Sequence, residues 1–308
     1  MYKKQRGINM KSYIKEKLDS FQSENKNRAR LLINCADQPG IVAAVSKFLF
    51  DHGANIIESN QYSTDPHGGE FFIRIEFEIP NLKEKAKELE SDFTAIKEQF
   101  ALEATFKYVS EVKKIAVFVS KEPHCLLELL WEWQSGDLMA DISLVISNHE
   151  TSREMVESLG IPYYYIPANK EIRREVEEKQ KELIEKYQVD VLILARYMQI
   201  LTPDFVKTYQ HQIINIHHSF LPAFIGAKPY ERAYNRGVKL IGATSHYVTN
   251  DLDEGPIIEQ DISRVDHRDN AEAMKKIGQS IERSVLARAV KWHLEDRIIV
   301  YGNKTIVF

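Results

Sequence analysis

An amide, an imidazole and a carboxylate fall at the ends of two apolar segments of this sequence. Asn215 and His217 close the run that begins at Gln212, and Asp253 lies in an acidic loop that follows the run from Gly242. A buried strand that ends in polar residues delivers their side chains to the rim of a sheet. There, an amide and an imidazole can donate hydrogen bonds to an oxyanion, and a carboxylate can take a proton from water. The three residues together therefore predict a site for acyl chemistry.

Each of the three residues also fits a structural role when it is taken singly. Asn215 would cap a turn, His217 would be a hydrogen-bonded imidazole of the core, and Asp253 would close an Asx-turn. Their joint occurrence favours catalysis. His246, in the middle of the second run, fits two roles equally well. It would orient Asp253 or a bound water as a supporting residue of the site, or it would support the core.

The segments that must position these residues alternate between strand and helix. From residue 113 onward, apolar runs typical of buried strands occur at 115–119, 142–146, 163–166, 189–194 and 213–216, with helical spacing between them. Residues 170–187 predict a surface helix whose charges face solvent. A strand, a helix over 269–295 and a hairpin over 298–308 follow residue 256. This order predicts an open, mostly parallel, Rossmann-like α/β sheet with its site at the carboxyl ends of the strands.

A smaller unit precedes this sheet and has the order strand, helix, strand, strand, helix, strand. Strands are expected over 31–35, 56–63, 70–79 and 104–109. One helix should carry Pro39 in its first turn and end at Gly53, and the other should cover 82–100. This is the split βαβ pattern of ferredoxin-like α+β domains. We expect a poorly ordered lead-in over 1–29, the smaller domain over 30–110 and the α/β domain over 111–308.

The bulk composition narrows the class of protein. A chain of 308 residues favours two domains, and 44% hydrophobic residues suffice for ordinary globular cores. A net charge of −4 gives no general attraction to nucleic acid, and no apolar stretch approaches the length of a membrane span. Cys35 and Cys125 lack metal-ligand spacing and predict neither a zinc site nor a disulfide framework. We therefore expect a cytoplasmic protein without nucleic-acid or membrane partners.

The turn before the first helix carries a recognisable pattern. The segment Asp37-Gln38-Pro39-Gly40-Ile41-Val42, with Asn55-Ile56 after the helix, resembles ACT domains, which commonly bind amino acids and pair through their sheets. The resemblance implies a homo-oligomer and an amino-acid effector site at Asp37, Gly40 and Asn55. Asp37 would accept backbone N–H groups at the helix start, and Gly40 would let a ligand or another backbone come close. A purely oligomeric role would select the same residues, so both roles stay open.

Two longer segments resemble the formyltransferase family that uses 10-formyltetrahydrofolate. They are Asn215-Ile216-His217-His218-Ser219-Phe220-Leu221-Pro222, followed by Gly226, and Gly242-Ala243-Thr244-Ser245-His246-Tyr247-Val248, followed by Asp253-Glu254-Gly255-Pro256-Ile257-Ile258. The similarity covers residues 113 to 300 and implies that Asn215, His217 and Asp253 are catalytic, with no metal and no cofactor. It also implies a pterin pocket, walled in part by the segment that starts at Arg196. The expected substrate-binding residues are Met198, Gln199, Ile200, Leu201, Val248, Asn250 and Asp251; of these, Ile200 and Leu201 would serve equally well in core packing.

The segment after the first strand of the larger domain indicates what the second reactant is. A transferase acting on glycinamide ribonucleotide needs a phosphate cradle there, normally rich in glycine. The segment Ser120-Lys121-Glu122-Pro123-His124-Cys125 has no glycine, Pro123 lacks an N–H, and Glu122 would repel a phosphate. Water is left as the nucleophile. We therefore expect hydrolysis of the folate substrate 10-formyltetrahydrofolate to tetrahydrofolate and formate.

Three other functions are kept as alternatives. The first is a glycinamide ribonucleotide formyltransferase, which would transfer the formyl group to that acceptor. The second is a methionyl-tRNA formyltransferase, which should carry a basic C-terminal tRNA-binding domain, for which the sequence up to Phe308 leaves no room. The third is a non-catalytic amino-acid sensor, which would have no need for the three catalytic residue types.

Overall fold

The computed structural model describes residues 10–65, 67–169, 171–223 and 229–308. The contacts divide the chain into two compact units. The larger contains Lys113–Leu294, residues up to Glu16 and Val300–Thr305; the smaller contains Lys17–Val112, Glu295–Ile299 and Ile306–Phe308. Parts of some predicted features lie outside the described residues, namely residues 1–9, Pro66, Lys170 and Gly226. Within the described ranges, no helix has the combined length and hydropathy of a membrane span.

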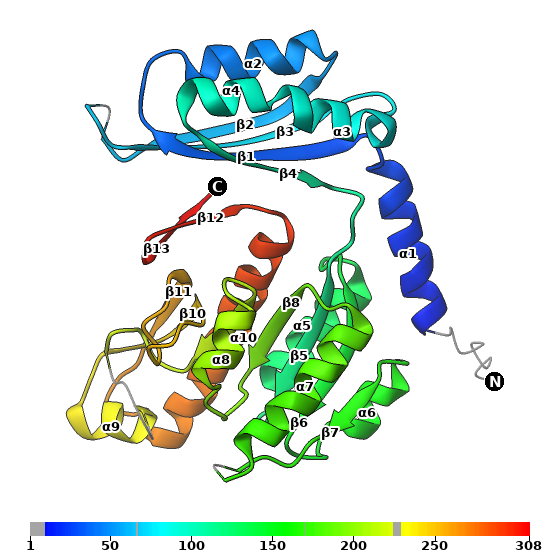
Figure 1. Cartoon of the computed structure of the whole chain (residues 1–308). Helices are drawn as coiled ribbons and strands as arrows, with labels where there is room; N and C mark the ends of the chain where they lie inside the picture. The colour runs from blue at the N-terminus through cyan, green and yellow to red at the C-terminus, as the bar shows by residue number, and fades with distance from the viewer. Residues whose placement is uncertain (1–9, 66, 170, 224–228) are drawn as a thin grey trace, which may run out of the picture. The chain divides into compact units, whose positions relative to one another are not determined.

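The smaller unit is a four-stranded antiparallel sheet with helices on one face (Figure 1). Its strands are β1 (Arg28–Ala36), β2 (Asn55–Ser63), β3 (Glu70–Glu78) and β4 (Glu103–Tyr108), in the order β2-β3-β1-β4. Burial alternates along β1, as it does in a strand with one face on a core. The helices are α2 (Ile41–Asp51), α3 (Leu82–Asp92) and α4 (Thr94–Phe100). The predicted ferredoxin-like order is confirmed.

Two helix boundaries in this unit differ from the prediction. The first helix begins at Ile41 after Gly40, whose left-handed φ of 99° interrupts the helix, so Pro39 precedes it. The second predicted helix is divided at Phe93, which ends α3 and begins α4. The fully buried Phe93 ring makes edge contacts with Phe48 and Phe106. Core packing therefore decides a break that the helical period of the sequence does not show.

The expectation of a poorly ordered lead-in is wrong for residues 10–24, which form α1 (Met10–Glu24). Ile14, Leu18 and Phe21 recur at helical spacing and are buried or partly buried. The Asn25 side chain donates to the carbonyl oxygen of Phe21 at 2.8 Å and closes the last turn. The apolar stripe is sparse among many charges, and for that reason the composition concealed it.

The larger unit contains a seven-stranded sheet of order β11-β10-β9-β8-β5-β6-β7. Five strands are parallel: β5 (Lys114–Val119), β6 (Asp141–Ser147), β7 (Tyr163–Tyr165), β8 (Val191–Ala195) and β9 (Ile213–His217). β10 (Leu240–Tyr247) runs antiparallel between β9 and β11 (Ile257–Arg264). The central strands are buried along nearly their whole length, as expected when helices cover both faces. The predicted mostly parallel α/β sheet is confirmed.

Helices cover both faces of this sheet (Figure 1). α5 (His124–Ser135) and α10 (Ala271–Leu294) pack together on one face; α7 (Arg173–Tyr187) and α8 (Pro203–Thr208) pack on the other, over a core that includes Phe118 and Leu194. The remaining helices are α6 (Arg153–Ser158) and α9 (Pro229–Arg236). The prediction that the charges of α7 face solvent is wrong for Glu177, which is 4% exposed because the backbone N–H of Thr202 donates to it at 2.7 Å.

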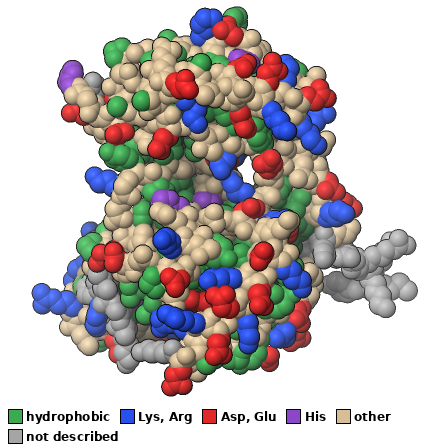
Figure 2. Space-filling model, viewed as in Figure 1, with side chains coloured by type: hydrophobic (Ala, Val, Ile, Leu, Met, Phe, Trp, Pro, Cys, Tyr) green, Lys and Arg blue, Asp and Glu red, His purple; other side chains and the backbone are tan. Residues whose placement is uncertain are grey.

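The predicted C-terminal hairpin is present as β12 (Ile298–Tyr301) and β13 (Lys304–Val307). The segment before it belongs to the smaller unit, contrary to the expected 111–308 domain. The buried guanidinium of Arg74 donates to the carbonyl oxygens of Glu295 at 3.2 Å and Asp296 at 3.1 Å, and Arg30 pairs with Asp296 at 3.1 Å. These contacts attach the segment to the sheet. Lysine and arginine side chains intermingle with acidic ones over the visible surface (Figure 2).

Candidate active site

β9 and β10 bring the predicted amide and the imidazoles together. Asn215 and His217 lie two residues apart on β9 and share one face of the strand. β10 runs beside it in a register that places His246 opposite Asn215. Nδ2 of Asn215 lies 3.2 Å from Nε2 of His246, whose Nδ1 donates to the carbonyl oxygen of Tyr247 at 2.9 Å. The pairing of β9 with β10 therefore brings the Asn215 amide and the His246 imidazole into direct contact.

The loop after β10 delivers the predicted carboxylate. This loop turns back so closely that the N–H of Tyr247 donates to the carbonyl oxygen of Pro256 at 2.9 Å. A Cβ atom at Gly255 would lie 1.8 Å from the backbone oxygen of Tyr247, so the return requires glycine. Asp253 has a φ of 60°, a left-handed conformation that aspartate tolerates better than most residues. The tight loop thereby turns the Asp253 side chain back to the sheet.

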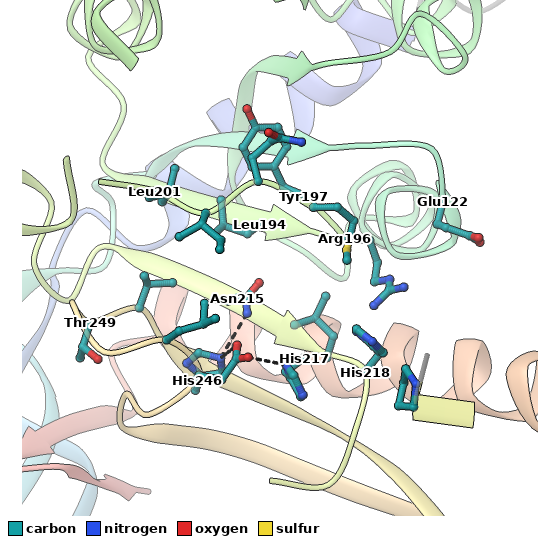
Figure 3. Close-up of a pocket in the computed structure, with 18 of the residues that line it drawn as sticks. Glu122, Leu194, Arg196, Tyr197, Leu201, Asn215, His217, His218, His246 and Thr249 are labelled. Atoms are coloured by element: carbon teal, nitrogen blue, oxygen red, sulfur yellow. Dashed lines mark hydrogen bonds and ion pairs between the residues drawn. The ribbon is translucent and has the colours of Figure 1, made fainter. Parts of the chain in front are cut away.

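The Asp253 carboxylate lies close to both imidazoles, His217 and His246, which are labelled in Figure 3. Oδ2 lies 3.2 Å from Nδ1 of His217, and Oδ1 lies 3.7 Å from Nε2 of His246. Burial raises the pKa of Asp253, but the hydrogen bonds from His217 and His246 outweigh burial and hold it well below its ordinary value. Nε2 of His217 is buried and has no hydrogen-bond partner among the described residues. One nitrogen of His217 is thus tied to a carboxylate and the other is left for a reacting group.

A cavity of about 870 Å³ lies beside these residues in the larger unit, and Asn215, His217, His246 and Asp253 line it. The seven residues predicted to bind substrate line it as well: Met198, Gln199, Ile200, Leu201, Val248, Asn250 and Asp251. Ile200 is 52% exposed, so a core-packing role does not account for it, whereas Leu201 is partly buried. Met198, Ile200, Leu201 and Val248 form an apolar wall of the cavity. The volume and this wall suit a small aromatic ligand.

Two polar groups from other elements fix the segment that carries this wall. The N–H of Met198 donates to Oγ of Ser120, just after β5, at 3.0 Å. Glu177, on α7, holds the N–H of Thr202 and also accepts from its hydroxyl. Each end of the wall is therefore positioned by tertiary contacts.

The opposite end of the cavity is polar and was not predicted. Arg196, His218, Tyr230 and Lys275 line it together with Glu122. Nζ of Lys275 lies 2.6 Å from Oε1 of Glu122, so this carboxylate, expected to repel a phosphate, has its charge paired. Burial, with the charge of Arg196, lowers the pKa of His218 to about 4. His218 is therefore neutral at neutral pH.

Glu282 of α10 is the residue of this region that sequence reasoning missed most clearly. Its side chain is 1% exposed, yet the sequence shows a signal for it. It shares a helical stripe with Gly278, Ile281, Val285 and Ala289, all of them buried. A charge on the buried stripe of a helix needs partners and marks a candidate functional residue.

Within the described residues, one group of metal-ligating side chains occurs, formed by His124, Cys125 and Glu282, with ligand atoms within 4.8 Å of one another. Nε of Arg196 lies 3.3 Å from Oε2 of Glu282 and already balances its charge. Burial raises the pKa of the Cys125 thiol well above its ordinary value. Both features disfavour a cation at this position.

The structure does not bring the three predicted effector residues together. Asp37 does not cap α2, which has no side-chain cap, and accepts instead from the Ser63 hydroxyl at the end of β2. Asn55 begins β2, eight residues earlier in an extended strand, so roughly 26 Å separates it from Ser63. Gly40 lies beside Asp37 in the turn. The prediction of one site from all three residues is therefore wrong within a single chain.

Comparisons with known proteins agree with this two-unit arrangement. A family model described as "Formyl transferase" matches residues 113–290, and one described as "ACT domain" matches residues 29–94. A protein of Bacillus subtilis named formyltetrahydrofolate deformylase is 68% identical over 299 residues, which is 97% of this chain and 100% of that protein. The chain belongs to the formyltetrahydrofolate deformylase family.

Solved structures separate the deformylase family from its relatives. A formyltetrahydrofolate deformylase from Pseudomonas syringae pv. tomato matches with a TM-score of 0.87 and 46% identity, covering 94% of this chain and 99% of that one. A glycinamide ribonucleotide transformylase from Symbiobacterium toebii matches with a TM-score of 0.60 and 27% identity, covering 64% of this chain and 94% of that one. The deformylase likeness extends over both units, and the transformylase likeness over one part of the chain.

Proposed function

We propose that this chain hydrolyses 10-formyltetrahydrofolate to tetrahydrofolate and formate. The observation that carries the proposal is the 3.2 Å contact between His217 and Asp253 beside Asn215, in a cavity with an apolar wall. Hydrolysis of a formamide needs a proton acceptor for water, a donor to the oxyanion and a proton for the leaving nitrogen. These residue types supply all three. Membership of the deformylase family supports the same reaction.

In the proposed reaction the pterin ring lies on the apolar wall, with the formyl carbon beside Asn215 and His217. Water attacks that carbon and gives its proton to His217. Asp253 is too weakly basic to take this proton, because its pKa is held low, and it orients His217 through Nδ1. The Asn215 amide donates to the oxyanion. His217 then protonates the folate nitrogen as the C–N bond breaks, which releases tetrahydrofolate and formic acid.

The reaction is proposed to use protein side chains and water alone, without a metal or a cofactor. The test is release of formate from 10-formyltetrahydrofolate by purified protein that has been dialysed against EDTA, with no amine present. We expect full turnover. A requirement for an amine acceptor would identify a transferase instead, and activity lost to EDTA and restored by a divalent cation would contradict the metal-free reaction.

We propose that the smaller unit pairs with a second copy of the chain through β2. β2 is an edge strand, and its apolar side chains Ile56, Ile57 and Tyr62 are 38%, 44% and 48% exposed. An exposed apolar edge strand is a template for pairing. Light scattering after size-exclusion chromatography should give the mass of an oligomer for the wild type and of a monomer for Ile57→Lys. An equal mass for both would contradict pairing through β2.

We propose that an amino-acid effector binds at the turn from Asp37 to Gly40. We also propose that the protein is cytoplasmic. The Asp37 carboxylate suits the ammonium group of an amino acid, and Gly40 presents backbone without a side chain. Calorimetric titration with each common amino acid should find one that binds wild type and not Asp37→Asn. If none of the amino acids gave a heat of binding, the effector site would be contradicted and only the oligomeric role of the smaller unit would remain.

A further inference from the structure

The polar end of the cavity is built around one buried carboxylate. Glu282 accepts a hydrogen bond from Nε2 of His124 at 2.7 Å and another from the hydroxyl of Tyr230 at 2.6 Å. Nε of Arg196 completes the group at 3.3 Å. Burial raises the pKa of Glu282, but the hydrogen bond from His124 and the charge of Arg196 lower it below its ordinary value. Glu282 is thus an ionised group held by two hydrogen bonds and one ion pair, each from a different segment.

The backbone of Arg196 is held in a conformation that arginine rarely adopts. Its φ is 62°, directly after β8, and its carbonyl oxygen accepts from the N–H of Ser120 at 3.3 Å. A left-handed residue that is not glycine costs free energy and persists where surrounding contacts hold it. The consequence is that the guanidinium, 11% exposed, points towards His218 next to the predicted catalytic residues (Figure 3).

Tyr230 reaches Glu282 because α10 carries a glycine at the crossing point. A Cβ atom at Gly278 would lie 2.0 Å from the Tyr230 hydroxyl oxygen and 2.3 Å from the nearest carbon of its ring. Any larger residue would therefore displace the ring from Glu282. The pairing of Tyr230 with a buried carboxylate is consequently a specific feature of the packing between α9 and α10.

Arg196 and Tyr230 line the polar side of the cavity, and Glu282, which does not line it, contacts both of them from within the packing. Figure 3 shows Leu194 and Leu201 to one side of Asn215, and Arg196 and His218 to the other. A folate ring on the apolar wall leaves the polar side for the second reactant. A solved transformylase shares the fold of this domain, with a TM-score of 0.60. Side chains at the polar side must therefore determine which nucleophile enters.

We propose that the Arg196–Glu282 pair, with Tyr230 and His124, closes the nucleophile side of the cavity, so that water reaches the formyl carbon and an amine does not. This inference rests on the proposed hydrolysis and specifies how its acceptor is selected. If the closure is opened, an amine nitrogen bonds to the formyl carbon and the bond from that carbon to the folate nitrogen breaks. The amine loses one proton and the folate nitrogen gains one, which leaves tetrahydrofolate and an N-formyl amine.

The experiment compares two products, formate and N-formylglycinamide, when the enzyme is given 10-formyltetrahydrofolate and glycinamide. Arg196→Gly removes the side chain, and glycine accepts the left-handed backbone without strain. Arg196→Asn serves as a second variant, since asparagine also tolerates this conformation and is much shorter. Gln188→Gly is the matched control: Gln188 is another left-handed residue, at φ 54°, and it does not line the cavity.

We expect the ratio of N-formylglycinamide to formate to rise about 10-fold or more in either Arg196 variant and to stay at the wild-type value in Gln188→Gly. An unchanged ratio in a folded Arg196 variant that still consumes the folate would overturn the proposal. A rise of equal size in the control would also overturn it. Acceptor-free formate release by the wild type tests the hydrolysis separately, so failure of the two ideas gives different results.

Discussion

Nδ1 of His217 lies 3.2 Å from Oδ2 of Asp253, although one residue ends a central strand and the other sits in a loop beyond the next strand. The contact makes Nδ1 the donor to a carboxylate that stays ionised, so the imidazole is fixed in orientation and its positive form is stabilised. Nε2 of His217 can then take up a proton from water and give it to the leaving nitrogen within one reaction cycle.

Asp253→Asn should lower kcat for formate release by roughly 100-fold, because an amide cannot stabilise the charged imidazole. Asparagine has the same shape and tolerates the left-handed φ of 60° at this position. The protein should therefore stay folded, with a thermal midpoint somewhat lowered by the loss of the charge beside the two imidazoles, and KM should stay close to the wild-type value. Steady-state kinetics and a melting curve decide it; a kcat within a few-fold of wild type would remove Asp253 from the chemistry.

Asn215→Ala should lower kcat by roughly 100-fold or more while changing KM little, as expected when a donor to the oxyanion is lost. The amide contacts the side chain of His246, and that contact is lost as well. Kinetics over a range of substrate concentrations separate the two parameters. If KM rose and kcat stayed constant, Asn215 would be a ground-state binding residue.

Ile200→Ser should raise KM for the folate about 10-fold and lower kcat much less, because an apolar contact that acts equally in ground and transition states is lost. Ile200 is half exposed, so the free energy of unfolding should barely change. Leu127→Ser is the matched control, since Leu127 is 46% exposed on α5 and does not line the cavity. A similar rise in KM for both variants would refute a folate wall at Ile200.

His218 predicts part of the pH dependence of stability. Its pKa is lowered from 6.5 to about 4 by burial and by Arg196, so protons bind the unfolded chain more tightly. The folded state is then fully stable above the unfolded pKa and loses stability as the pH falls towards 4. Between about pH 7.5 and pH 5, His218→Gln should lose about 2 kcal/mol less than wild type.

Urea denaturation at both pH values measures this difference. Wild type and His218→Gln share all other titrating groups, so the comparison isolates the single imidazole. Parallel losses of stability in the two proteins would show that His218 does not remain neutral in the folded state.

The sequence alone determined the order of most elements and predicted residues that the structure brings together at the candidate site, Asn215, His217 and Asp253. The periodicity of apolar residues reflects which side of each strand or helix is buried. Strands and helices can therefore be predicted from the sequence without coordinates. The position of the polar residues at the end of the run 213–217 could be predicted for the same reason. The resemblance of these segments to a known family added their chemistry, which periodicity does not encode.

Tertiary structure decided which side chains meet. The pairing of Asn215 with His246 depends on an antiparallel register, and the Arg196–Glu282 pair joins a residue just after β8 to one on α10, which no local pattern connects. Asn55 shows the converse, since a strand carries it away from Asp37 despite a shared motif. Burial of a charge is a property of the whole packing. Glu177 looks like an ordinary helix charge in the sequence, and Glu282 stands out only by its place on an apolar stripe; for both, partners from distant segments make the burial stable.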